Sequence, residues 1–389
     1  MEWIAVNKNK RNIMYAIARF LSLINRIIPK NKKLILFYDS MNECLTDNTE
    51  AIYNYIHNKS TKYKLVSCIP NCKKKDINTV GTIRGVLTYL RATYVFYSFG
   101  DFRIQPSKKQ IVINQWHGAP IKAIGKITNQ EIYQKERLDN FTYLTSTSPL
   151  FSKVMQKAFD CDKDKIIPIG QARNDYLFSD KEVLSYLNIK KEKYKKLILW
   201  MPTFRVSKDK RFFDSEIKNK ETLLPILEST NDLIKLNDLL CDENIFLVIK
   251  IHEHSDFNKI DFSNIKSITN REILPKGVKL YEFVKEFDAL ITDYSSIFVD
   301  YLILNRPIGF TLDDYNSYLE NRGFSIDNPI NMMPGHHILN YEDFINFILD
   351  ISNSYDKYEI DRYNILKLTN SYYDNKNCER LIKLAGIEL

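Results

Sequence analysis

Glycine is scarce in this sequence: there are 11 glycines among 389 residues, and no two of them form a Gly-x-Gly pair. The nucleotide-binding loops of dinucleotide-binding and P-loop proteins need closely spaced glycines, because the backbone itself wraps the phosphates there. The closest pair, Gly81 and Gly85, belongs to neither pattern. If the protein binds a nucleotide, it must hold the phosphates without a glycine cradle.

Cysteine is also rare and scattered, and of the six cysteines only Cys68 and Cys72 lie close together. No Cys/His cluster has the spacing of a zinc site. This composition favours a reduced, cytoplasmic setting over a disulfide-bonded secreted one. No secretory signal is visible, since no apolar segment is followed by a small-residue cleavage site.

The positive charge is concentrated at one end of the chain. The whole sequence has a formal net charge of +8, and residues 1–33 hold eight basic residues and one acidic residue, a net +7. About +1 is left for the remainder, so a general nucleic-acid-binding surface is not expected. The length and the 44% hydrophobic content predict a folded protein of two domains.

Residues 10–28 are predicted to form an amphipathic helix that ends before Pro29. Apolar side chains recur every three or four residues, at Ile13, Ile17, Phe20, Ile24 and Ile27, and the other side carries Arg11, Arg19, Asn25 and Arg26. The segment is short of the ~20 apolar residues that span a bilayer. A basic amphipathic helix suits an anionic membrane surface, which we expect it to bind from the cytoplasmic side as a peripheral protein. An ordinary helix packed on its own domain is the alternative.

From residue 33 onward, apolar strand-like runs alternate with helical periodicity. The predicted strands are 34–38, 63–69, 92–97, 111–114, 143–146 and 166–169, and then 197–201, 246–251, 265–268, 289–292 and 307–310. The predicted helices are 48–58, 81–90, 129–138 and 149–159, and then 220–240, 280–286, 295–304 and 341–353. Alternation of this kind predicts an α/β fold with parallel sheets covered on both faces.

Two Rossmann-like halves that face a cleft are the expected architecture. The predicted organisation is an N-terminal helix over 1–32, a first domain over 33–185 and a second over 190–389. The lysine-rich stretch 180–196 is interpreted as a linker, and the tail 358–389 as helical and able to cross back to the first half.

The stretch from Ala289 to Tyr301 predicts a strand, a tight turn and a helix. Asp293 stands at the carboxyl end of the strand, where open α/β sheets bind ligands. Ser295 and Ser296 occupy the expected start of the helix, where backbone N–H groups and a partial positive charge favour phosphate. A capped helix start with a turn aspartate is the alternative.

His117 follows another predicted strand, in the run from Asn114 to Lys122, and Trp116 and Gly118 flank it. A strand-end loop places this histidine at the ligand side of a parallel sheet, where it can serve as a general base. A satisfied structural histidine is the alternative.

Three further strand ends carry basic or polar side chains: Arg173 and Asn174 follow Gly170, Arg205 follows Pro202, and His252 and His254 follow Lys250. Arg322 stands before Gly323 in a polar loop and could complete an anion site. Arginine suits phosphate, although a hinge salt bridge and a solvated loop arginine are the alternatives for Arg173 and Arg205. His252 is better used as a donor to phosphate than as a metal ligand, because no third ligand is evident. His336 and His337 have no assigned role.

Taken together, these motifs resemble the CDP-glycerol glycerophosphotransferase family of teichoic-acid and capsule synthesis. The segments that carry the resemblance are Trp116–Lys122, Thr147–Pro149, Gly170–Asp175, Pro202–Arg205, Lys250–His252, Ile291–Ser296, Asp300–Tyr301, Asn305–Pro307 and Arg322–Gly323, in order over about residues 111–340. Two departures concern fine positioning: Ala119 stands where the family usually has Thr, and Glu253 where it often has Pro. The length resembles that of the shorter members, which include enzymes that add the first glycerol phosphate.

The resemblance implies a GT-B fold and a metal-independent enzyme with no cofactor. It implies that CDP-glycerol, or CDP-ribitol, is the donor and that a lipid-linked saccharide or a growing polymer on the cytoplasmic membrane face is the acceptor. His117 and His252 match the family's motif histidines. The expected donor-binding residues are Arg205, Lys250, Asp293, Ser295, Ser296 and Arg322, and possible acceptor or phosphate contacts are Trp116, Lys122, Arg173 and Asn174. A GT-B glycosyltransferase that uses a nucleotide sugar and a non-catalytic membrane-bound scaffold remain as alternatives.

Overall fold

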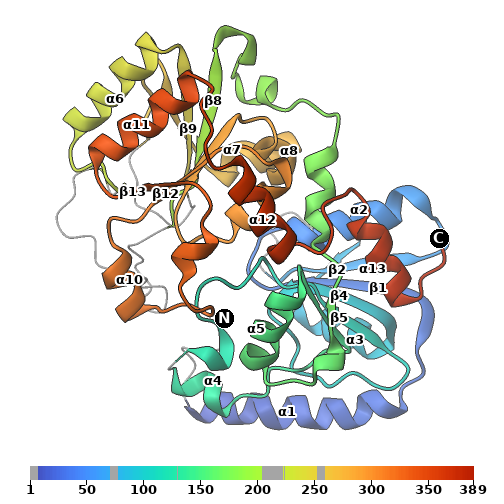
Figure 1. Ribbon diagram of the computed structural model, residues 1–389. Coiled ribbons are helices and arrows are strands. Elements are labelled where there is room, and N and C mark those ends of the chain that lie inside the picture. Colours follow the sequence, from blue (N-terminus) through green and yellow to red (C-terminus); the bar gives the residue numbers. More distant parts are fainter. Residues whose placement is uncertain (1–7, 71–77, 129, 204–221, 223, 252–258) are drawn as a thin grey trace. The chain divides into compact units, whose positions relative to one another are not determined.

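The computed structural model describes residues 8–70, 78–128, 130–203, 222, 224–251 and 259–389. The chain forms two compact units, and each is an α/β body with its own parallel sheet (Figure 1). Unit 1 comprises 1–119, 125–176 and 370–389, and unit 2 comprises 120–124 and 177–369.

Unit 1 contains a seven-stranded sheet in the order β3-β2-β1-β4-β5-β6-β7, in which all neighbours are parallel. Its strands are β1 (Asn31–Asp39), β2 (Lys64–Cys68), β3 (Thr79–Val80), β4 (Ala92–Phe99), β5 (Ile111–Asn114), β6 (Tyr143–Ser146) and β7 (Ile166–Pro168). Its helices include α1 (Lys8–Ile27), α2 (Asp47–Lys59), α3 (Thr82–Arg91), α4 (Glu131–Lys135), α5 (Pro149–Phe159) and α13 (Asn377–Ala385).

Unit 2 contains a six-stranded parallel sheet in the order β10-β9-β8-β11-β12-β13. Its strands are β8 (Lys196–Trp200), β9 (Ile245–Lys250), β10 (Ile265–Ile268), β11 (Ala289–Thr292), β12 (Ile308–Thr311) and β13 (His336–Ile338). Its α-helices are α6 (Thr230–Asp242), α7 (Asn270–Ile273), α8 (Leu280–Val284), α9 (Ile297–Tyr301), α10 (Tyr315–Asn321), α11 (Tyr341–Ser352) and α12 (Glu359–Thr369) among the residues that the structure describes.

The predicted α/β class and parallel sheets are confirmed, and the bounds of the predicted strands agree closely because these strands are rich in buried apolar residues. Two strands were missed, β3 and β13, because they are only two and three residues long. The helix predicted over 220–240 is wrong at its start. There α6 begins at Thr230, after a capping box formed by Ser229 and Asp232.

The stretch 180–196 is not an open linker. It forms two 3₁₀ helices, η5 (Leu184–Leu187) and η6 (Lys191–Lys193), in unit 2. Val183, Leu184, Leu187 and Ile189 are buried. The many lysines suggested a solvated segment, but these four apolar side chains hold it against the unit.

The last twenty residues belong to unit 1, where α13 packs on α2 (Figure 1). The carboxylate of Asp175 accepts hydrogen bonds from the backbone N–H groups of Asn377 and Cys378, each at 2.9 Å. A carboxylate at this position satisfies N–H groups that the helix itself cannot and interacts favourably with the helix dipole. It thereby joins the 3₁₀ helix η4 (Ala172–Phe178), which follows β7, to the start of α13.

Candidate active site

In unit 1, His117 stands in a tight turn directly after β5. Asn114 Oδ1 accepts a hydrogen bond from Trp116 N at 2.9 Å, and Trp116 adopts a left-handed backbone conformation with φ of 54°. The imidazole of His117 stacks on Phe99, with ring centres 4.5 Å apart, and lies 4.0 Å from the ring of Trp116. The turn and the two rings define the position of the imidazole.

The imidazole of His117 is neutral at physiological pH. Burial lowers its pKa to about 4, and the nearby positive charge of Arg173 acts in the same direction. Nδ1 lies 3.4 Å from the backbone oxygen of Ser98. A carbonyl oxygen can only accept a hydrogen bond, so this contact favours a proton on Nδ1 and a lone pair on Nε2. His117 is only half-buried, and its Nε2 has the chemistry of a proton acceptor.

Arg173 is buried and bonded within unit 1. Its Nη1 donates to the backbone oxygen of His117 at 3.2 Å and forms an ion pair with Asp47 Oδ2 at 3.8 Å. The structure therefore brings Arg173 beside the His117 turn, as a group that supports it. Contacts of Arg173, Trp116 and the buried Asn174 with a phosphate or an acceptor stay predictions.

Three residues near His117 come from the first hundred positions, which the motif analysis did not use. They are Asp47 and Asn48 at the start of α2 and Ser98 near the end of β4. A usable signal was present, because Asp47 and Asn48 stand at the start of the helix predicted over 48–58, which follows a predicted strand. Neighbouring parallel strands end at the same edge of a sheet, so the ends of β1, β4 and β5 converge on one place.

In unit 2, the carboxylate of Asp293 joins the ends of two neighbouring strands, β8 and β11. Its Oδ2 accepts from Thr203 N at 2.7 Å, and its Oδ1 accepts from the Thr203 hydroxyl and from Ser295 N at 3.2 Å. Asp293 is completely buried. We therefore interpret Asp293 as the residue that positions the loop of Thr203 and the turn of Ser295, and a direct contact with a donor stays a prediction.

Ser295 and Ser296 precede a helix shorter than predicted. Helix α9 spans five residues and continues into the 3₁₀ helix η9 (Leu302–Leu304). The side chain of Ser296 makes no capping hydrogen bond, and both serines are half-buried. A helix this short has few aligned peptide dipoles, so any phosphate binding here would depend mainly on the two hydroxyls.

Lys122 belongs to unit 2, although it follows His117 by only five residues. Its backbone pairs with Phe324 in an antiparallel bridge, and Ala123 N donates to the oxygen of Gly323, which follows Arg322, at 3.0 Å. Lys122 Nζ lies 3.2 Å from Thr203 Oγ1 and 5.5 Å from the ring centre of Tyr318. The structure thus places Lys122 with Thr203 and Asp293, whereas the sequence had grouped Lys122 with the His117 motif.

The other predicted donor-binding residues are placed less fully. Lys250 ends β9, the strand next to β8, and is half-buried, as is Arg322. Arg205, His252 and His254 lie outside the described residues. Their roles stay predictions.

Several motif residues have structural partners. The hydroxyl of Tyr281 donates to Asp300 at 2.6 Å, that of Tyr301 donates to the oxygen of Phe287 at 2.9 Å, and Arg306 donates to the same oxygen at 2.6 Å. His336 lies 3.3 Å from Asp350, and His337 lies 3.0 Å from the oxygen of Met333. These residues stabilise unit 2.

Comparison with known proteins identifies the same family that the sequence motifs resemble, over nearly the whole chain. The profile of the family described as CDP-glycerol:poly(glycerophosphate) glycerophosphotransferase matches residues 20–385. The chain is 29% identical over 350 residues to a teichoic acid poly(glycerol phosphate) polymerase of Bacillus spizizenii, covering 80% of this chain and 82% of that one. It is 27% identical over 389 residues to a teichoic acid glycerol-phosphate transferase of Staphylococcus aureus, covering 90% and 92%.

A solved structure supports the fold. The wall teichoic acid polymerase TagF matches with a TM-score of 0.75 and 21% identity, over 96% of this chain and 93% of that chain. The order of the motifs, the two parallel sheets and the family match agree. The chain belongs to the CDP-glycerol:poly(glycerophosphate) glycerophosphotransferase family.

Proposed function

We propose that this protein transfers glycerol phosphate from CDP-glycerol to a hydroxyl of a lipid-linked saccharide or polymer in teichoic acid or capsule synthesis. The acceptor hydroxyl attacks the β-phosphorus of the donor, the bond from that phosphorus to the bridging oxygen breaks, and CMP leaves. Such a transfer needs a base, alignment and stabilisation of charge.

The observation that carries this proposal is the position of His117 at the end of β5, where Nδ1 lies 3.4 Å from the oxygen of Ser98 and a lone pair is left on Nε2; burial favours the neutral imidazole by lowering its pKa. In this proposal unit 1 supplies His117 as the base that takes the hydroxyl proton. Unit 2 holds the donor phosphates, where Lys122 supplies a positive charge and Ser295 and Ser296 supply hydroxyl donors. His252 is proposed as a further donor to phosphate.

The experiment is a donor screen with purified full-length protein, which follows CMP release in the presence of a glycerol-phosphate-primed acceptor. We expect CMP release from CDP-glycerol. Release from CDP-ribitol alone would assign the ribitol donor, and release of UDP from UDP-sugars alone would assign a nucleotide-sugar glycosyltransferase. No turnover with any donor would favour the scaffold interpretation.

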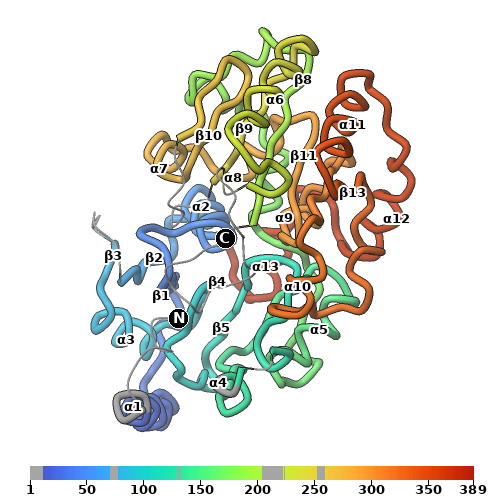
Figure 2. Tube along the Cα trace, turned by 90° about the vertical axis from the view of Figure 1, so that its left-hand side faces the viewer, coloured from blue at the N-terminus to red at the C-terminus, as the bar shows by residue number. Residues whose placement is uncertain are grey.

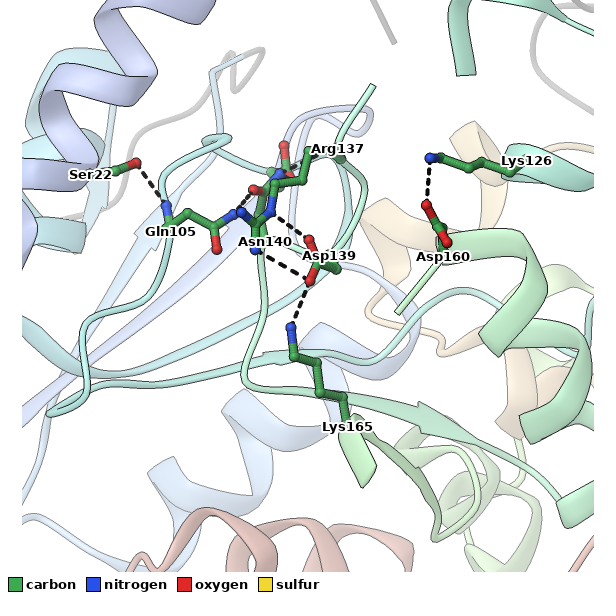
Figure 3. Close-up of polar contacts among 9 residues, drawn as sticks. Ser22, Gln105, Lys126, Arg137, Asp139, Asn140, Asp160 and Lys165 are labelled. Carbon is green, nitrogen blue, oxygen red and sulfur yellow. Dashed lines mark hydrogen bonds and ion pairs between the residues drawn. The ribbon is translucent and has the colours of Figure 1, made fainter. Parts of the chain in front are cut away.

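We also propose that α1 binds the cytoplasmic face of an anionic membrane. The buried side chains of this helix are the small or polar Ala18, Ser22 and Asn25, whereas most of its large apolar side chains are exposed. Figure 3 shows one of these contacts, in which Ser22 Oγ accepts a hydrogen bond from Gln105 N at 3.0 Å. The side chain of Asn25, which the sequence had placed among the solvent-facing residues, is buried and donates to Gln105 O and to Gln110 Oε1 at 2.9 and 2.6 Å.

The exposed side of α1 combines large apolar residues with basic ones. Ile13, Ile17, Phe20, Leu23 and Ile27 are each more than half exposed, and Arg19 and Arg26 are exposed beside them. This argues against the alternative in which the apolar stripe packs on its own domain. No helix in the described part of the chain is both long and apolar enough to cross a bilayer. An exposed apolar face on a basic segment supports binding in the plane of the interface.

A second helix supports the same proposal. Helix α3 lies next to α1 in both views (Figures 1 and 2), and Lys30 Nζ donates to the oxygen of Leu90 near the end of α3. Ile83 and Leu87, one helical turn apart, are 80% and 58% exposed, and Arg84 between them is exposed as well. We include this part of α3 in the proposed membrane-binding surface.

A further inference from the structure

We propose that Asn48, in the first turn of α2, is a positioning residue that places His117 for proton transfer. The inference rests on the proposed function in one respect, the role of His117 as the base. Asn48 belongs to none of the motifs that the sequence analysis singled out, and its side chain is completely buried.

One amide joins three separate segments of unit 1. Asn48 Nδ2 donates to the backbone oxygen of Trp116 at 3.0 Å and to Gln171 Oε1, and its Oδ1 accepts from the backbone N–H of Arg173 at 3.0 Å. A backbone oxygen can only accept and a backbone N–H can only donate. The two backbone partners therefore determine which end of the amide is which.

Two of the three hydrogen bonds act on the surroundings of His117. The first restrains Trp116, which adopts an unfavourable left-handed conformation, directly precedes His117 and has its ring 4.0 Å from the imidazole. The second restrains the backbone of Arg173, whose Nη1 donates to the oxygen of His117 at 3.2 Å. His117 is thus held from both sides by groups that Asn48 orients.

Asparagine is needed here because it donates and accepts at once in a site closed to water. Asn48→Asp keeps the shape and the acceptor for Arg173 N but turns an oxygen toward the oxygen of Trp116, which replaces a hydrogen bond by a repulsion. Gln171 can rotate its amide to donate to the new carboxylate, so the loss falls mainly on the Trp116 turn. The added negative charge also favours the protonated imidazole and raises the pKa of His117.

The experiment compares the full-length wild-type protein with Asn48→Asp and Asn48→Ser, and with Asn54→Asp as the matched control. Asn54 lies on the same helix and donates to the Tyr176 hydroxyl at 3.0 Å, away from the His117 turn. CMP release from CDP-glycerol gives kcat and KM, and NMR of the imidazole groups gives the pKa of His117 without any turnover.

For Asn48→Asp we expect kcat to fall by about 10- to 100-fold, because a misplaced base loses alignment, while KM for CDP-glycerol is unchanged. The pKa of His117 should rise in this variant, and Asn48→Ser should lower kcat without adding a charge. Asn54→Asp should change neither quantity.

Wild-type kcat in both Asn48 variants, with an unchanged pKa of His117, would overturn the inference. So would an equal loss of kcat in Asn54→Asp, which would indicate a general effect on α2. A different result separates the inference from the proposed function. If His117→Ala is fully active while Asn48→Asp still shifts the pKa of His117, the geometry is right and the role of His117 as base is wrong.

Discussion

The carboxylate of Asp293 accepts hydrogen bonds from both the backbone N–H and the side-chain hydroxyl of Thr203, and so ties the end of β11 to the end of β8. The same carboxylate accepts from Ser295 N, and Lys122 Nζ lies beside the Thr203 hydroxyl. The buried acid thus connects Thr203 and Ser295 directly, and Lys122 through Thr203.

The first prediction concerns this connection. Asp293→Asn should weaken CDP binding and lower the free energy of unfolding by about 1–3 kcal/mol, because an amide N–H₂ then faces N–H and hydroxyl donors inside the protein. Thr203→Val, which keeps the backbone N–H, should have a smaller effect of the same sign. Calorimetry with CDP and thermal melts measure both quantities. Unchanged CDP affinity in Asp293→Asn would separate this cluster from the donor site.

His117→Ala should abolish most transfer while leaving CDP affinity intact, since loss of a general base costs about 10²–10⁴ in rate. His337→Ala is the matched control, because its ring contacts the oxygen of Met333 in unit 2. CMP release and CDP titration report the two effects separately. A variant with near-normal turnover would remove His117 from the mechanism.

The pH dependence of kcat/KM should follow the lowered pKa of His117. The pKa of His117 falls from an ordinary 6.5 to about 4 in the folded protein. The base therefore stays unprotonated, and protonation of His117 should not reduce activity until the pH is well below 6.5. Arg173→Met should shift the acidic limb of the profile to higher pH, because it removes a positive charge that lowers the pKa of His117. A wild-type limb at or above pH 6.5 would contradict the assignment.

The same shift has a consequence for stability. The folded state favours the neutral imidazole of His117. The resulting contribution to the free energy of unfolding is fully present above pH 6.5 and is lost as the pH falls toward about 4. Between these values the unfolded chain binds more protons at this site. The melting temperatures of wild type and His117→Gln should therefore converge as the pH is lowered through this window.

The apolar face of α1 should bind membranes without contributing to folding. The double variant Ile17→Asp/Phe20→Asp should lose binding to liposomes that contain anionic lipid, with little change in melting temperature, because these side chains are 52% and 62% exposed. Ile360→Asp is the matched control, since Ile360 on α12 is 75% exposed. Co-sedimentation measures the binding, and retention of the double variant on liposomes would contradict the membrane proposal.

The α/β class, the strand positions and the strand-end location of His117 and Asp293 could all be predicted from local sequence. Buried parallel strands are short apolar runs, and polar residues directly after them lie at the ligand edge whatever the rest of the chain does. The apolar periodicity of residues 13–27 likewise determined an amphipathic helix, but it could not tell which face packs on the protein.

Only the tertiary structure decided which residues meet. Asn48 and Asp47 reach the His117 turn from far away in the chain, and Lys122 lies with Thr203 and Asp293 in unit 2, because strand order and crossovers bring distant strand ends to one edge. The pKa of His117 depends on burial between Phe99 and Trp116 and on the charge of Arg173. Contacts of this kind join residues that have no fixed spacing in the sequence, so no local pattern records them.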